Sequence, residues 1–188
     1  GSHEGDLFPL GRMLHPDATV VAPRAPFAGA PWGYGPGWAW YRFIGGTTPE
    51  PESFVAGQAK LDAFLDGVHA ALGLDPATPL VLGGFSQGGT SSLAWALRHP
   101  GRAAKVVVFS GFLADHPSVA ATPDTVRGTR IWWGHGTHDP AIPHAHAVTG
   151  RVALVAAGAD LTTVDYPGMG HTIAQRTLED AAVFVREG

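Results

Sequence analysis

The chain alternates between short, almost continuously apolar runs and longer segments with helical spacing, and this alternation restricts its fold more than any other feature. Residues 105–110 (KVVVFS) and 130–134 (RIWWG) are apolar nearly throughout, as in strands that are buried on both faces of a parallel sheet. Helical patterns over 87–99 and 143–157 follow a strand pattern in each case. We therefore expect an α/β domain with a mainly parallel central sheet and helices on both faces.

The remaining elements are predicted from the same patterns. Further strands are expected at 18–22 (ATVVA), 80–82 and 161–166, and further helices over 54–72, with Gly73 as the stop, and over 172–187. The 188 residues fit a single domain that spans 1–188. Residues 27–51 form a long stretch rich in glycine, proline and aromatic residues, and a loop of this length in a small domain is usually functional.

Composition excludes several classes of protein. The net charge is −4 and the basic residues are scattered, which argues against a surface that follows nucleic-acid phosphates. The absence of cysteine rules out disulfides, thiolate metal sites and a cysteine nucleophile. No apolar run reaches the roughly 18 residues of a membrane span. No leader peptide is visible at the first residue, so a cytoplasmic location is expected, although a leader already removed would leave no trace.

Residues 84–88 form a G-x-S-x-G motif between a predicted strand and a predicted helix, which is the context in which this motif holds a nucleophilic serine. The tight turn requires small neighbours, which Gly84, Gly88 and Gly89 supply, and it lifts the Ser86 hydroxyl above the sheet. It also aims the Gln87 backbone N–H at the position of an oxyanion, where the helix N-terminus favours negative charge. The alternative is a glycine-rich turn in which Ser86 only caps the helix.

A serine hydroxyl is a weak nucleophile unless a base removes its proton. With this motif the chain order is nucleophile, acid and histidine. Asp139 lies just past the strand predicted at 130–134, and His171 lies just past the strand at 161–166. Because ligands and functional groups gather beyond the carboxyl ends of parallel strands, we expect Ser86, Asp139 and His171 to form a catalytic triad.

Both assignments have alternatives. Asp139 is also suited to cap the helix that follows it, and His171 is also suited to be an ordinary residue at a helix N-terminus. Asp115 and Asp165 are rival acids. Asp115 follows a different strand, and Asp165 lies inside a strand and is expected to point away.

A second grouping consists of His135, His138, Asp139, His144 and His146, whose side chains suit zinc or non-haem iron. These residues straddle a strand end, a loop and a helix start, with no pair on one helical face. We therefore expect solvated histidines, no metal and no cofactor. A metal-dependent hydrolase stays open as an alternative, as does a non-catalytic ligand-binding protein on this fold.

Five stretches together resemble the α/β-hydrolase superfamily and, within it, the phospholipase/carboxylesterase family, which includes acyl-protein thioesterases and small bacterial carboxylesterases. The stretches are VVAPRAPF at 20–27, GGFSQGG at 83–89, VVVFSGFL at 106–113, WGHGTHDPAIP at 133–143 and YPGMGHTI at 166–173. The resemblance covers nearly the whole chain. It implies Ser86 as nucleophile, Asp139 as acid, His171 as base and Gln87 as one oxyanion donor, in a serine hydrolase that cleaves esters or thioesters.

The first residues depart from the family pattern. Family members carry earlier strands, one of which ends in a His-Gly turn that precedes the second oxyanion donor. Asp6-Leu7 resembles the loop just after that turn. We therefore expect that N-terminal strands are missing before Gly1, or that residues 1–3 are the scar of an expression tag. The missing strand would lie beside the strand that carries the nucleophile, and the second oxyanion donor is left unassigned.

Substrate choice is expected to come from the loop at 27–51. Trp38 and Trp40 in this loop, and Phe112 after the strand at 105–110, are candidate walls for an acyl chain or an aromatic ester. The alternative is that these aromatic residues only pack the loop onto the domain. No large lid is visible between 110 and 130, which favours small, soluble esters. The expected partners are a small-molecule ester and, as one option, a second copy of the chain in a homodimer.

Overall fold

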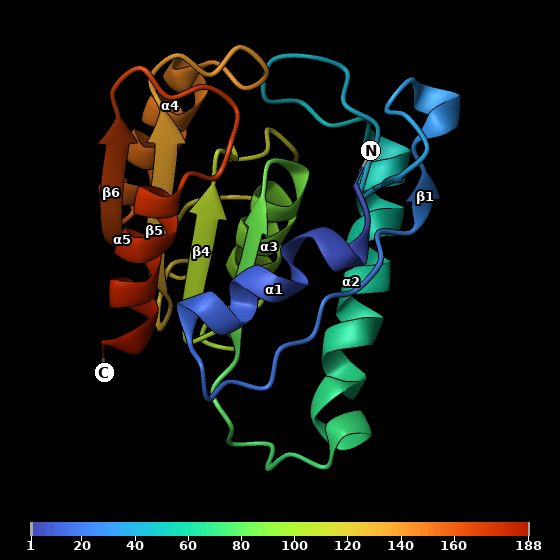
Figure 1. Ribbon diagram of the computed structural model, residues 1–188, viewed down its shortest axis with the longest axis vertical. Helices are drawn as coiled ribbons and strands as arrows, with labels where there is room; N and C mark the ends of the chain where they lie inside the picture. The colour runs from blue at the N-terminus through green and yellow to red at the C-terminus, as the bar shows by residue number, and fades with distance from the viewer. Residues whose placement is uncertain (1, 188) are drawn as a thin grey trace.

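Four parallel strands form the centre of the computed structural model, which describes residues 2–187. The strands lie in the order β3 (Val81–Phe85), β4 (Lys105–Phe109), β5 (Arg130–Gly136) and β6 (Asp160–Tyr166), each parallel to its neighbours (Figure 1). All four arrows in Figure 1 point the same way, so the segments that follow the strands gather along one edge of the sheet. The predicted α/β architecture is confirmed.

Helices cover both faces of this sheet (Figure 1). One face carries α2 (Pro51–Leu72), α3 (Gln87–Arg98) and α4 (His144–Ala156), and the other carries α1 (Glu4–Leu14) and α5 (Gln175–Arg186). Successive side chains of a strand point to opposite faces. Buried side chains of β4 and β5 therefore divide between two cores. Val106, Val108, Ile131 and Trp133 pack toward α2, α3 and α4, and Val107, Phe109 and Trp132 pack toward α5.

Residues 18–22 do not form the strand that their composition predicts. A strand needs a hydrogen-bonding neighbour, and β3 pairs only with β4 among the residues that the structure describes. Val20 instead packs against Gly11 of helix α1. The contact is so close that a Cβ added to Gly11 would lie 2.5 Å from Cγ1 of Val20. The prediction of a strand there is wrong for lack of a partner strand.

Helix α1 is absent from the sequence prediction, and it contains Pro9 and two glycines, which have low helix propensity. Two other effects outweigh this propensity. The His3 side chain accepts a hydrogen bond from the backbone N–H of Gly5 and caps the helix, and Leu10 and Leu14 pack into the core beneath α5. Helix α5, conversely, begins three residues later than predicted, with Ala174 as its N-cap.

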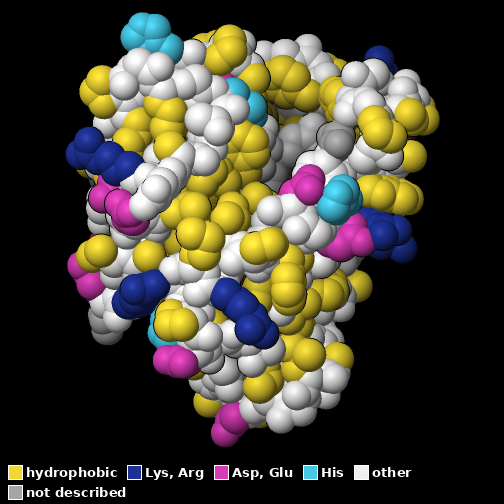
Figure 2. All heavy atoms as spheres, in the orientation of Figure 1, with side chains coloured by type: hydrophobic (Ala, Val, Ile, Leu, Met, Phe, Trp, Pro, Cys, Tyr) yellow, Lys and Arg dark blue, Asp and Glu magenta, His cyan; other side chains and the backbone are white. Residues whose placement is uncertain are grey.

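The predicted loop at 27–51 contains short elements of its own. Strands β1 (Phe27–Ala28) and β2 (Trp38–Ala39) pair antiparallel around the 3-10 helix η1 (Ala30–Trp32). No helix in residues 2–187 is both long and apolar enough to cross a membrane. On the face shown in Figure 2, Lys and Arg side chains are scattered among other types rather than gathered into one patch.

Candidate active site

Ser86 occupies a strained turn between β3 and α3. Its φ of 55° and ψ of −118° lie in a region that side chains other than glycine rarely adopt. The backbone holds this conformation at both ends, since the Ser86 N–H donates to the Phe109 carbonyl and the Ser86 carbonyl accepts from Thr90. Although Ser86 stands at the N-cap position, its side chain makes no capping hydrogen bond. The strained turn therefore leaves the Ser86 hydroxyl free of the capping role and able to face a substrate.

Two glycines of the motif are required by close packing of the turn. A Cβ on Gly84 would lie 2.3 Å from the backbone carbon of Gly88, and a Cβ on Gly89 would lie 2.8 Å from the Gly84 oxygen. At Gly88 itself a Cβ would meet nothing within 4 Å. The expectation that Gly88 must be small for the turn to form is therefore wrong, because only side chains at 84 and 89 would meet the backbone of the turn.

Asp139 and His171 meet where β5 and β6 end. The Nδ1 atom of His171 lies 2.7 Å from Oδ2 of Asp139, whose side chain is fully buried. The other carboxylate oxygen accepts hydrogen bonds from the backbone N–H groups of Ala141 and Ile142. Asp139 thus closes the turn before α4 and orients His171 as well. The alternative that Asp139 caps the helix is wrong, because α4 begins at His144 with Pro143 as its N-cap and has no side-chain cap.

Close backbone packing brings the two loops together. A Cβ on Gly136 would lie 2.2 Å from the Met169 carbonyl oxygen, and that oxygen accepts a hydrogen bond from the His138 N–H. The His171 ring in turn lies on Phe85, the residue before Ser86, with ring centroids 4.5 Å apart. The histidine therefore contacts the turn that carries the serine as well as the loop that carries the carboxylate.

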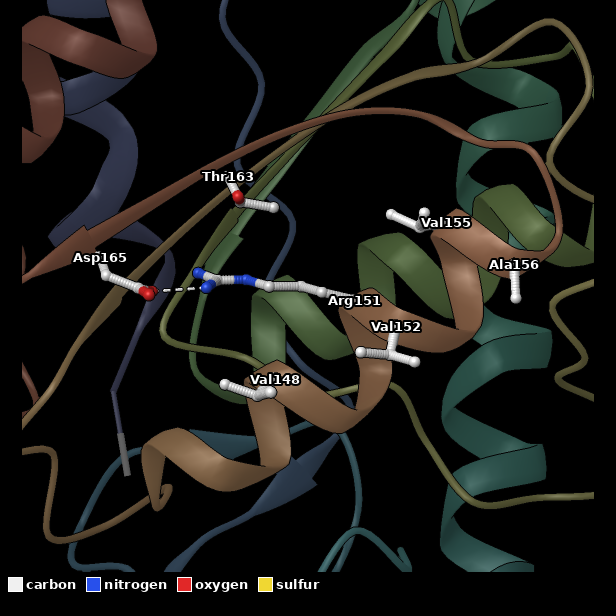
Figure 3. Close-up of a pocket in the computed structure, with 7 residues that line it drawn as sticks. All are labelled: Val148, Arg151, Val152, Val155, Ala156, Thr163 and Asp165. Atoms are coloured by element: carbon white, nitrogen blue, oxygen red, sulfur yellow. Dashed lines mark hydrogen bonds and ion pairs between the residues drawn. The ribbon is translucent and has the colours of Figure 1, made fainter.

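The rival acids are engaged elsewhere. Asp115 is exposed and accepts a hydrogen bond from Thr48. Asp165 points toward Arg151 of α4, which donates to it, on the shallow hollow outside α4 and β6 (Figure 3). His144 also pairs with Asp165, at 2.9 Å. The structure therefore gives neither carboxylate a contact with His171.

The histidines near residue 139 have separate partners. His138 is exposed and contacts the Thr137 hydroxyl. His135 is fully buried, which corrects the expectation of a solvated side chain, and burial lowers its pKa. In the described part of the chain, no three His, Asp or Glu side chains are arranged to hold a metal ion.

The Gln87 side chain ties the aromatic loop to the serine turn. Its Oε1 atom accepts from the backbone N–H of Trp40 at 3.0 Å, and its Nε2 atom donates to the carbonyl of Tyr41 at 3.1 Å. The sequence pattern assigns only the backbone N–H of Gln87. No local signal reveals the side-chain bonds, because the partners lie 46 and 47 residues away in the chain.

The aromatic candidates differ in their surroundings. Trp38 is partly buried beneath the guanidinium of Arg24, and Trp40 is partly buried against the core. Phe112 is only 1% exposed and packs on Tyr41 and Phe43. In this conformation Phe112 supports the loop from beneath and presents almost no surface to a ligand.

Comparison with known proteins identifies the family of the chain. Residues 7–187 match the family model described as phospholipase/carboxylesterase. Esterase YpfH of Escherichia coli (strain K12) is 34% identical over 179 residues, which cover 92% of this chain and 71% of that protein. Acyl-protein thioesterase 1 of Gibberella zeae is 32% identical, but the match covers 57% of this chain and only 47% of the thioesterase.

Solved structures show the same fold over nearly the whole chain. The structure of esterase PE8 matches with a TM-score of 0.77 and 31% identity, covering 99% of this chain and 87% of that one. The carboxylesterase from Mesorhizobium loti matches with a TM-score of 0.81 and 26% identity, covering 98% and 83%. The expected resemblance is confirmed: the chain has the α/β-hydrolase fold and belongs to the phospholipase/carboxylesterase family of carboxylesterase-type enzymes.

Proposed function

We propose that the protein hydrolyses carboxylic esters through Ser86, His171 and Asp139 by way of an acyl-enzyme intermediate. The observation that carries the proposal is the hydrogen bond between Asp139 and His171 beside the strained serine turn. A carboxylate oxygen only accepts, so this bond requires the proton on Nδ1 of His171. That tautomer leaves Nε2 unprotonated and able to take the serine proton.

The reaction then runs in two halves. The Ser86 oxygen attacks the ester carbonyl carbon while His171 takes its proton, and Asp139 stabilises the imidazolium. The oxyanion accepts a hydrogen bond from the Gln87 N–H at the N-terminus of α3. His171 then protonates the leaving alcohol or thiol. In the second half, His171 activates a water molecule, which releases the carboxylic acid and restores the serine.

The substrate class follows from the loop at 27–51. We place Trp38 and Trp40 beside the acyl group, while Phe112 supports the same loop through its contacts with Tyr41 and Phe43. An oxygen ester is the first candidate, and a thioester the second, because acyl-protein thioesterases are among the relatives. A panel of p-nitrophenyl esters of increasing chain length, with one thioester, tests this assignment. Faster turnover of short chains supports small esters, and a preference for long chains contradicts it.

Loss of the Gln87 side-chain bonds should change selectivity more than chemistry. In Gln87→Met the backbone N–H stays, whereas both bonds to residues 40 and 41 are lost. Each bond contributes on the order of 1 kcal/mol. We expect kcat/KM for a bulky aryl ester to fall about tenfold and that for p-nitrophenyl acetate to fall less than threefold. An equal loss on both esters would count against a role of this side chain in holding the loop.

Removal of metal ions separates the triad from the metal-dependent alternative. Because the proposed chemistry uses only side chains and water, prolonged incubation with a strong chelator should leave kcat unchanged. The measurement is p-nitrophenyl acetate turnover before and after dialysis against the chelator. A loss that added zinc or iron restores would favour the metal-dependent reaction.

The single domain, the cytoplasmic location and the homodimer stay predictions.

A further inference from the structure

A buried histidine lies behind the proposed acid. His135 is the second-to-last residue of β5, four residues before Asp139, and its side chain is 0% exposed. Its Nε2 atom lies 2.9 Å from the Ile142 carbonyl oxygen and 3.5 Å from Oδ2 of Asp139. The same Oδ2 atom accepts the bond from His171, so one carboxylate oxygen faces both imidazole rings.

The neighbours of this ring determine its protonation. A carbonyl oxygen and a carboxylate oxygen only accept hydrogen bonds, so the proton must lie on Nε2. Nδ1 is buried and has no hydrogen-bond partner among the described residues, so a second proton there would have no acceptor. Burial has the largest effect and lowers the pKa of His135; the hydrogen bond to Ile142 and the charge of Asp139 oppose it, whereas Arg151 and His144 act in the same direction as burial. The ring is therefore a neutral donor that does not compete with His171 for the carboxylate.

Two hydrogen bonds to the backbone of Ile142 link His135 to the acid. His135 donates to the carbonyl of Ile142, and the N–H of Ile142 donates to Oδ1 of Asp139. Oδ2 of Asp139 then accepts from His171. We propose that His135 is a positioning residue, which fixes the turn at 139–142 and so holds the Asp139 carboxylate against His171. This inference rests on the proposed function, since it treats Asp139 as the acid.

A pair of substitutions isolates the donated hydrogen bond. His135→Phe keeps a flat ring of similar size but removes the donor, whereas His135→Gln places an amide N–H at a similar reach. We expect kcat for p-nitrophenyl acetate to fall roughly 10- to 100-fold in the phenylalanine variant, with KM within twofold, since the variant leaves the Ile142 carbonyl without its donor and loosens the turn at 139–142. The glutamine variant should recover most of the loss. If His135→Phe does not fold, His135→Asn replaces it, because its shorter amide cannot reach Ile142.

A double-mutant cycle with Asp139→Asn distinguishes positioning from general damage. If His135 acts through Asp139, its removal should lower kcat less than threefold further in the asparagine background. If the double variant loses the product of the two single-variant losses in kcat, His135 acts independently of Asp139 and the inference is overturned. A wild-type kcat in His135→Phe and His135→Asn, with Asp139→Asn impaired, overturns it as well. Both results leave the proposed function standing. Full activity in Asp139→Asn and His171→Ala would instead overturn the proposed function itself.

Discussion

Replacement of Ser86 by alanine is expected to lower kcat for p-nitrophenyl acetate by about 10⁶-fold, because the nucleophile and base of such a site act as a unit. The same substitution should abolish covalent labelling by a serine-reactive fluorophosphonate. The expected loss is large because no other group can form the acyl-enzyme from the strained turn. His171→Ala should lower both readouts to a similar degree, since the hydroxyl then lacks its base.

Ser110 supplies a matched control. It also follows a buried strand, it also has a positive φ, of 49°, and its backbone N–H likewise bonds across to the next strand. Its hydroxyl is buried, so Ser110→Ala should keep the fluorophosphonate labelling that Ser86→Ala loses. Labelling that persists in Ser86→Ala would contradict the nucleophile assignment. A wild-type protein that neither hydrolyses esters nor reacts with the probe would favour the non-catalytic binding protein.

The sequence predicts the parts of this structure that depend on local patterns. Buried strands are recognisable in KVVVF and RIWW because the side chains on both faces of each strand are apolar. Residues 139 and 171 each lie just past a strand, and parallel strands place such positions at one edge of the sheet. The short distance between Asp139 and His171 follows from that geometry.

Features that depend on distant partners escape such patterns. The sequence does not reveal that Pro9 lies in a helix held by packing against α5, or that residues 18–22 pair with no strand in the part of the chain that the structure describes. His135 looks like its neighbours in a histidine-rich segment, yet it lies in β5, which extends to Gly136 and is buried on both faces. Phe112 follows a strand as a wall residue would, but Tyr41 and Phe43 cover it from a distant loop.

The second large effect is expected at Gly84, where alanine should lower the free energy of unfolding by about 3 kcal/mol. The added Cβ would lie 2.3 to 2.6 Å from backbone atoms of Gly88 and Gly89. Backbone in the first turn of a helix cannot rotate away as a side chain can, so α3 must shift from the end of β3. For a domain of this size the loss corresponds to a melting temperature lower by roughly 6–12 °C, which calorimetry measures.

Gly88→Ala provides the matched control within the same motif. Its Cβ would meet nothing within 4 Å, and alanine favours a helix interior over glycine by up to about 1 kcal/mol. The melting temperature of Gly88→Ala should therefore equal or exceed that of the wild type. Equal destabilisation at both positions would mean that the motif tolerates no side chain for some reason other than contact.

A shift of α3 in Gly84→Ala also moves the Gln87 N–H, so fluorophosphonate labelling should slow even at temperatures where the variant is folded.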